Sequence, residues 1–328
     1  MYTNAFKIFK MGYASALGVV LILVLLIISL IQFRVRRAQG EILGKEGPRM
    51  SYRAKKNLWK LLVYLLMAVI VVICLFPVVW SCIISIKSVG EKVSGFSALT
   101  ISQPTLANYE RLFELLPIWQ HLGNSVFTSV MGTLTTLFFC SLAGFAFAKY
   151  RFPARNALFY FVVATMTIPA EVGSIPLFLI MRNLDLINNL WSLILPRLAT
   201  AVGVFYLRQY MMEVPDEILE AARIDGCRDF GIFVRVVCPI VKPALASWAS
   251  LTLIARWNDF FWPLLFLNKS SKYTLMVSVS MLPLSDGLAT PWQVILSGTT
   301  LVIVPSIVIY LFMQTFQKEG ATAGAVKG

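Results

Sequence analysis

Long apolar stretches separated by short polar segments dominate this chain. A membrane-spanning helix needs about 20 largely apolar residues, and seven stretches reach that length. Four of them carry no charged residue, and the other three carry one or two. This pattern predicts an all-α polytopic membrane protein. The predicted spans are Ala14–Phe33, Leu61–Ile86, Leu122–Ala148, Asn156–Met181, Leu186–Leu207, Pro243–Asn268 and Gly287–Gln317.

The basic residues between the predicted spans are distributed unequally. Nineteen of the 29 Lys and Arg residues fall on one side, eight fall on the other, and Arg197 and Arg256 lie inside spans. Cytoplasmic loops of membrane proteins carry the excess of Lys and Arg. The N-terminus is therefore expected outside and the C-terminus in the cytoplasm of a bacterial-type inner membrane. The first span is too long for a secretory signal, and more positive charge follows it than precedes it.

Composition supports the membrane assignment. Of the 328 residues, 58% are hydrophobic and 14% charged, with a mean hydropathy of +0.75, whereas soluble domains have roughly 45–50% apolar and about 25% charged residues. An ordinary soluble enzyme and a disordered chain are both excluded. The formal net charge of +13 fits loops that face anionic membrane lipid better than a nucleic-acid partner.

Few residues in this chain suit catalysis. There is one histidine, His121, and five cysteines without a CxxC pairing, expected to be reduced and apolar in role. No GxxxxGK[ST] phosphate loop is present. The sequence therefore predicts no metal site, no cofactor in this chain and no enzyme active site. His121 itself is expected to be incidental, near the outer membrane face.

One long polar loop, Met211–Lys242, separates the fifth and sixth spans. Pro215 suits the first turn of a helix, and the acidic residues that follow it favour a helix N-terminus. Ile218, Leu219 and Ala222 are expected on one face, and Gly226 ends the helix. A second amphipathic stretch places on one face Phe230, Phe233, Val234 and Val237. A helix–turn–helix at the membrane surface is predicted.

Within this loop lies a motif with family-specific spacing. Glu220-Ala221-Ala222 is followed after three residues by Gly226, and after nine more by Val236-x-Cys238-Pro239. This arrangement resembles the EAA loop of ABC-transporter permeases, in the form found in carbohydrate-uptake permeases of the maltose and glycerol-3-phosphate type (MalG-like). Val and Cys replace the usual Ile and Leu. The resemblance extends over about residues 50–328, through Asn108-Tyr109, Asn124-Ser125, Trp257-Asn258-Asp259, Pro263-Leu264 and Gly324–Gly328.

The resemblance implies a type I ABC-importer permease of MetI-like fold, with six core helices plus one extra N-terminal helix. Residues 60–328 would form the transmembrane domain, and the loop would be the helix that docks on a cytoplasmic ATPase dimer, which binds ATP. The other implied partners are a second, MalF-like permease subunit and an extracytoplasmic solute-binding protein that delivers a sugar or polyol. The residues implied in ATPase coupling are Glu220, Ala221, Ala222, Asp225, Gly226 and Pro239.

The beginning of the chain departs from this pattern. Residues 1–35 resemble the last helix of the companion MalF-like permease, and residues 36–59 read as a basic cytoplasmic linker. Met50 begins a segment that reads as a natural start. We interpret the chain as a gene-junction product; the alternative is an added anchor helix.

Charged residues inside spans are costly and usually have a reason. Arg256 and Asp259, three residues apart, either pair with each other or line a passage for a polyhydroxylated solute. Arg197 is expected to snorkel or cap, and Gly144 and Ala148 to pack helices. The alternative function is an ion-coupled secondary transporter that uses Asp259, Arg256 and Glu171. The candidate residues of the substrate pathway are Glu171, Arg256, Trp257, Asn258, Asp259 and Trp262.

Overall fold

The computed structural model describes residues 49–285 and 290–325. The chain divides into two compact units, residues 1–74 and 75–328, and each is described by itself. The predicted first span and the start of the linker lie outside the described residues. Helix α2 (Arg49–Ser85) begins at Arg49, so the last part of the predicted linker is helical.

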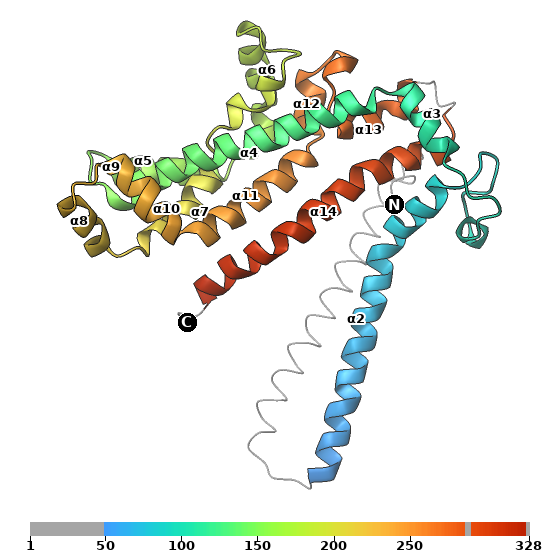
Figure 1. Cartoon of the computed structure of the whole chain (residues 1–328), viewed down its shortest axis with the longest axis horizontal. Helices are drawn as coiled ribbons and strands as arrows, with labels where there is room; N and C mark the ends of the chain where they lie inside the picture. The colour runs from blue at the N-terminus through green and yellow to red at the C-terminus, as the bar shows by residue number, and fades with distance from the viewer. Residues whose placement is uncertain (1–48, 286–289, 326–328) are drawn as a thin grey trace. The chain divides into compact units, whose positions relative to one another are not determined.

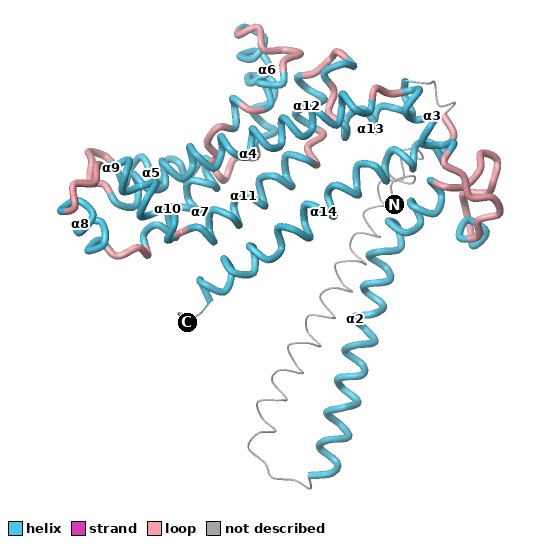
Figure 2. Tube along the Cα trace, in the orientation of Figure 1, coloured by secondary structure: helices cyan, strands magenta, loops and turns pink. Residues whose placement is uncertain are grey.

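Helices account for nearly all regular structure in the described residues. Figure 2 shows helices joined by loops and no strand in that part of the chain; one isolated bridge joins Lys87 and Pro104. The α-helices are α3 (Ala107–Leu115), α4 (Ile118–Lys149), α5 (Arg155–Thr165), α6 (Ser174–Asn183), α7 (Ala201–Met212), α8 (Asp216–Ile224), α9 (Asp229–Ile232), α10 (Cys238–Ile240), α11 (Lys242–Trp257), α12 (Phe261–Phe266), α13 (Leu275–Ser285) and α14 (Trp292–Ala325). The 3₁₀ turns are η2 (Phe96–Leu99), η3 (Ala170–Gly173), η4 (Leu190–Leu193), η5 (Leu195–Arg197) and η7 (Ser270–Lys272), and η6 (Phe233–Val237) is a π-helical turn.

Six predicted spans fall wholly or largely in the described residues, and three of them are not single helices. Within the described residues, single helices long and apolar enough to span a membrane are found in α2, α4 and α14, and three bent pairs also qualify when each pair is taken as one span. The span predicted over Asn156–Met181 bends by 92° between α5 and η3–α6. Pro169 lies at this break, where its missing N–H and fixed φ end the helix.

Two more of the predicted spans are also interrupted. The span predicted over Leu186–Leu207 bends by 48° between η4–η5 and α7, with Pro196 inside η5. The span predicted over Pro243–Asn268 ends its main helix at Trp257, and a separate short helix, α12, follows. Short 3₁₀ and helical segments at membrane depth are tolerated where protein surrounds them.

Helices α4, α7 and α11 pack against one another, and α14 packs against α11 (Figure 1). Two glycines allow the close approach of α4 and α7. A Cβ on Gly144 would lie 3.0 Å from the backbone nitrogen of Arg208, and one on Gly203 would lie 2.7 Å from Cys140 Sγ. The packing role predicted for Gly144 is confirmed, as expected where small residues bring membrane helices together.

One end of α4 is fixed by polar contacts that the sequence did not suggest. His121 is fully buried and its Nε2 lies 2.9 Å from the Ser270 carbonyl, so its interpretation as incidental is wrong. The nearby Asn124 amide donates to the carbonyls of Ser271 and Tyr273. These bonds attach the segment after α12 to α4, because a buried polar group needs a partner.

The loop after α2 is ordered around a buried lysine. The Lys87 side chain is 1% exposed, and its ammonium donates to the carbonyls of Lys92, Ser97 and Ala98 at 3.0–3.1 Å. Glu91 lies 3.7 Å away and accepts from the backbone of residues 102 and 103. Three carbonyls satisfy the three protons of the ammonium group, which gives this loop one defined conformation.

Candidate coupling loop and intramembrane charge cluster

The segment from α7 to α11 has the predicted helix–turn–helix form. Helix α8 ends in a motif in which Cys227 N–H donates to the Ala222 carbonyl and Gly226 N–H to the Arg223 carbonyl. Gly226 has a φ of 81°. This is a Schellman C-cap, whose left-handed position favours glycine. The chain therefore turns sharply after α8 and returns toward the spans through α9.

Helix α8 has one face packed on the protein and one exposed face. Leu219 and Ala222 are buried in a cluster with Phe145 of α4 and Phe233 of η6. Ile218, predicted on the same face, is 41% exposed. Ala222, implied by the resemblance in ATPase coupling, packs against its own chain and is 8% exposed. The exposed residues of α8 include Glu217, Glu220, Ala221 and Ile224; we call these four the outer face of α8.

Ile224 stands out on the outer face because it is 87% exposed. A single exposed apolar side chain is common on a protein surface, but Ile224 extends the outer face of α8 beyond Glu217, Glu220 and Ala221 and is accessible to a partner protein. Sequence reasoning missed this residue. Its position two residues after Ala222, the last of the EAA residues, and directly before Asp225, which is also exposed, was the available signal.

The second half of the loop corrects the predicted amphipathic face. Phe233 and Val237 are buried, but Phe230 and Val234 are 59% and 46% exposed, and Ile232 is buried instead. The reason is the π-helical turn η6, where Cys238 N–H donates to the Phe233 carbonyl five residues back. Such a turn breaks the 3.6-residue period. Pro239 follows it, exposed, inside α10.

Lys149, at the end of α4, attaches the start of α8 to the spans. Its side chain is only 5% exposed; its Nζ donates to Asp216 Oδ1 at 2.6 Å and to the Val214 carbonyl. This hydrogen bond, together with the positive charge of Lys149, holds the pKa of the Asp216 carboxyl below its ordinary value. In the sequence, Lys149 contributed only to the excess of basic residues on the expected cytoplasmic side. In the structure it ties α8 directly to α4.

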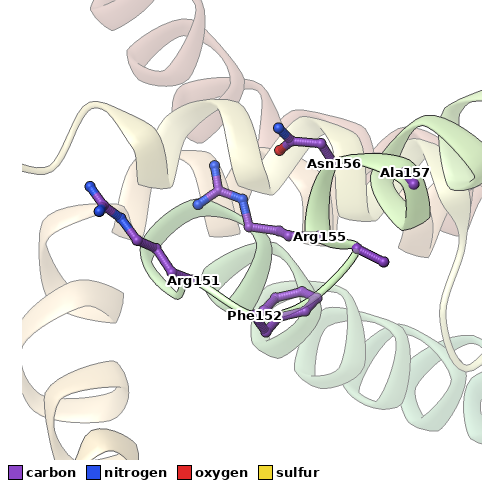
Figure 3. Close-up of a pocket in the computed structure, with 6 residues that line it drawn as sticks. Arg151, Phe152, Arg155, Asn156 and Ala157 are labelled. Atoms are coloured by element: carbon purple, nitrogen blue, oxygen red, sulfur yellow. The ribbon is translucent and has the colours of Figure 1, made fainter.

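A basic hollow lies next to this contact, where α4 passes into α5. Figure 3 shows the side chains of Arg151 and Arg155 on the same side of the loop, with Phe152 pointing elsewhere. The hollow has a volume of about 430 Å³ and also borders Asn156. Arg155 donates to the Tyr150 carbonyl at 3.1 Å. The end of the helices that carries α8 is therefore rich in positive charge.

The second candidate site is built around Arg256, which is 8% exposed. Its guanidinium donates to the Leu193 carbonyl at 3.1 Å, to Thr136 Oγ1 at 2.7 Å and to the Arg197 carbonyl at 2.9 Å. Thr136 in turn donates to the Arg197 carbonyl. A Cβ on Gly132 would collide with the guanidinium. Gly132 thus leaves the space that Arg256 occupies, and Arg256 joins α4, η4–η5 and α11.

The predicted pairing of Arg256 with Asp259 is wrong. Asp259 instead forms an ion pair with Arg197, Nη2 to Oδ2, at 2.7 Å, and its Oδ1 accepts from the Trp262 backbone N–H. Residues three apart on a helix can pair, but α11 ends at Trp257, so Arg256 and Asp259 do not share a helix. The expectation that Arg197 snorkels or caps is corrected: Arg197 is the ionic partner.

The remaining pathway candidates separate into buried and exposed residues. Trp257 is buried and its Nε1 donates to the Val302 carbonyl, and the buried Trp262 stacks on Phe266 at 5.8 Å. Asn258 is exposed at the end of α11 and accepts from Ser306. Glu171 is exposed in η3. The structure therefore brings together Arg256, Asp259 and Trp262 around Arg197, and leaves Glu171 outside that cluster.

Two cavities adjoin this cluster, and Arg197 lines both. One, of about 350 Å³, is also bordered by Ser192, Trp262 and Phe266. The other, of about 330 Å³, is bordered by Arg256, Thr200 and Trp248. Both lie at the lower end of the roughly 300–1,000 Å³ typical of ligand pockets.

Known proteins resemble most of this chain in sequence. Residues 140–319 match the family described as "binding-protein-dependent transport system inner membrane component". An arabinooligosaccharides transport system permease protein of Halalkalibacterium halodurans is 34% identical over 264 residues, covering 80% of this chain and 94% of that protein. A polygalacturonan/rhamnogalacturonan transport system permease protein of Bacillus subtilis is 30% identical, covering 84% and 100% respectively.

A solved structure extends the comparison to the fold. A bacterial ABC transporter involved in the import of the acidic polysaccharide alginate superposes with a TM-score of 0.72 at 26% identity. The match covers 83% of this chain and 99% of that chain. The predicted MetI-like fold is thereby confirmed.

Proposed function

The chain belongs to the binding-protein-dependent transport system inner membrane component family, and on this premise we propose that it is a permease subunit of an ATP-driven sugar importer. The chain covers nearly the full length of curated relatives that transport oligosaccharides. One structural observation carries the proposal: helix α8 presents an exposed face outward while its opposite face is packed on the spans.

We propose that α8 lies on the cytoplasmic side. The hollow at Arg151 and Arg155 and the buried Lys149 lie at the same end of the helices as α8, and positive residues concentrate at the cytoplasmic ends of spans. The opposite end, where Lys87 orders its loop, would then face the solute-binding protein. This orientation places the C-terminus in the cytoplasm.

In this proposal the outer face of α8 docks on a cytoplasmic ATPase, which supplies the ATP site. Glu220 offers a carboxylate, Ala221 allows close approach and Ile224 offers an apolar contact. Motion of the ATPase would reach the spans by two routes: the packing of Leu219 on Phe145 and the bond between Asp216 and Lys149. Because both routes end on α4, α8 would move with α4 as one body and alternate the access of the pathway.

The proposed assembly holds a second permease of the MalF-like kind, two ATPase copies and an extracytoplasmic solute-binding protein. The solute-binding protein is expected because the family is described as part of a binding-protein-dependent transport system. This chain contributes no cofactor site in the proposal and acts as a non-enzymatic transport subunit.

Uptake measurements test the function. In cells that express the complete importer, uptake of a labelled oligosaccharide is expected to stop on depletion of ATP. In right-side-out vesicles that hold ATP, orthovanadate enclosed with the ATP is expected to stop this uptake as well. A protonophore that leaves ATP constant should not change it. Uptake abolished by the protonophore at constant ATP would support the ion-coupled alternative and contradict this proposal.

A further inference from the structure

The intramembrane cluster holds two guanidinium groups and one carboxylate. Arg197 and Arg256 are positive, Asp259 is their single ionic partner, and no other Asp or Glu of the described residues forms an ion pair with either arginine. The cluster therefore carries one net positive charge. Charge at membrane depth is costly unless it is paired or serves a ligand.

The two arginines differ in how many donors are free. Arg256 is 8% exposed and directs three of its five N–H donors to two carbonyls and one hydroxyl. In the described residues Arg197 uses only Nη2, toward Asp259 and the Leu193 carbonyl, and its side chain is 28% exposed. The Nε and Nη1 donors of Arg197 remain available. Nε and Nη1 lie on opposite sides of the guanidinium, and each of them can donate a charge-assisted hydrogen bond to a carboxylate.

The two cavities that Arg197 lines have the chemistry of a saccharide site. Trp262 and Phe266 border one cavity and Trp248 the other, and aromatic faces suit the apolar faces of sugar rings. Hydroxyl groups of Ser192, Thr200 and Thr252 border the same spaces and suit sugar hydroxyls. Neither cavity has an acidic residue among its lining residues; the nearest carboxylate is that of Asp259, whose charge is paired with Arg197.

We propose that Arg197 binds the carboxylate of an acidic sugar unit during passage, so that this permease favours uronate-containing oligosaccharides over neutral ones. The inference rests on the proposed importer function and adds the substrate class. Arg256 acts as a positioning residue, because its bonds to the Leu193 and Arg197 carbonyls fix the backbone that carries Arg197. Asp259 holds Arg197 when no substrate is present.

Calorimetric titration of the purified importer complex, without its solute-binding protein, tests this proposal. The probes are trigalacturonate and the matched neutral galactotriose. The wild-type complex is expected to bind the acidic trisaccharide at least about tenfold more tightly, which corresponds to about 1.4 kcal/mol. Arg197→Gln should remove this preference. The control Arg182→Gln, which changes an exposed arginine at the end of α6, should keep it.

Two further measurements keep the result decisive. If Arg197→Gln unfolds at a lower temperature than Arg182→Gln, Arg197→Lys replaces it. This variant keeps the charge but has one donor nitrogen in place of three, and it is expected to retain only part of the preference. Equal affinity of the wild-type complex for both probes, or an unchanged preference in the Arg197 variants, overturns the proposal. If ATP-dependent uptake of neutral sugars persists in that case, the proposed importer function still stands.

Discussion

Reversal of charge at Glu220 to lysine is expected to lower ATP-dependent uptake at least about a hundredfold while leaving the protein inserted in the membrane. Glu220 is exposed on α8 and has no ion-pair partner in the described residues, so the change removes nothing from the fold. At a protein interface, a like-charge contact costs several kcal/mol, enough for this loss. Uptake and the amount of membrane-inserted protein are measured on the same cells.

The matched control for this prediction is Glu213→Lys. Glu213 is also exposed and lies at the end of α7, at the same end of the helices as α8 but not on the outer face of α8. Uptake by this variant should stay within about twofold of wild type. Normal uptake by Glu220→Lys would argue against docking through the outer face of α8.

Replacement of Asp259 by leucine is expected to destabilise the protein by about 3–5 kcal/mol, the usual cost when one partner of a buried ion pair is removed. Asp259 has a side chain 9% exposed and is the ionic partner of Arg197. Its loss would leave two guanidinium groups without a carboxylate. Since whole proteins are stable by only about 5–15 kcal/mol, the midpoint of thermal unfolding in detergent should fall clearly.

A second variant separates lost charge balance from lost packing. The double variant Arg197→Leu with Asp259→Leu removes both partners together, and a balanced removal costs far less than a one-sided one. We expect it to recover most of the thermal midpoint lost by the single Asp259 variant. A single Asp259→Leu variant as stable as wild type would show that the ion pair does not hold this region.

The spans and the helix–turn–helix that holds α8 were predictable because their signals are local. An apolar stretch of about 20 residues is visible in any window of the chain, and the acidic start and glycine end of α8 follow one another within eleven residues. The angles of the sharp bends could not be predicted. Pro169 indicates an interruption of the helix, but a proline in a membrane helix can either kink it slightly or end it. Which of the two occurs depends on the packing of the neighbouring helices.

The charge cluster was predictable only in part, because its contacts are distant in sequence. Arg256 and Asp259 are visible as a close pair, whereas the true ionic partner, Arg197, lies 59 residues before Arg256 and belongs to a different span. Gly132 makes room for the guanidinium from a third span. The contact of Lys149 with Asp216 spans 67 residues. Such pairings depend on how the helices pack, and one sequence does not show that.

Photo-crosslinking at residue 224 tests the central claim most directly. In the intact importer, Ile224 replaced by the photoreactive residue benzoylphenylalanine is expected to crosslink to the ATPase subunit on illumination, with a yield that changes when ATP is added. Benzoylphenylalanine placed instead at Glu110, in the first turn of α3 and at the opposite end of the helices from α8 (Figure 1), should give no ATPase adduct. Strong adducts at 110 and none at 224 would contradict the account, because α8 would then not be the part of the chain that meets the ATPase.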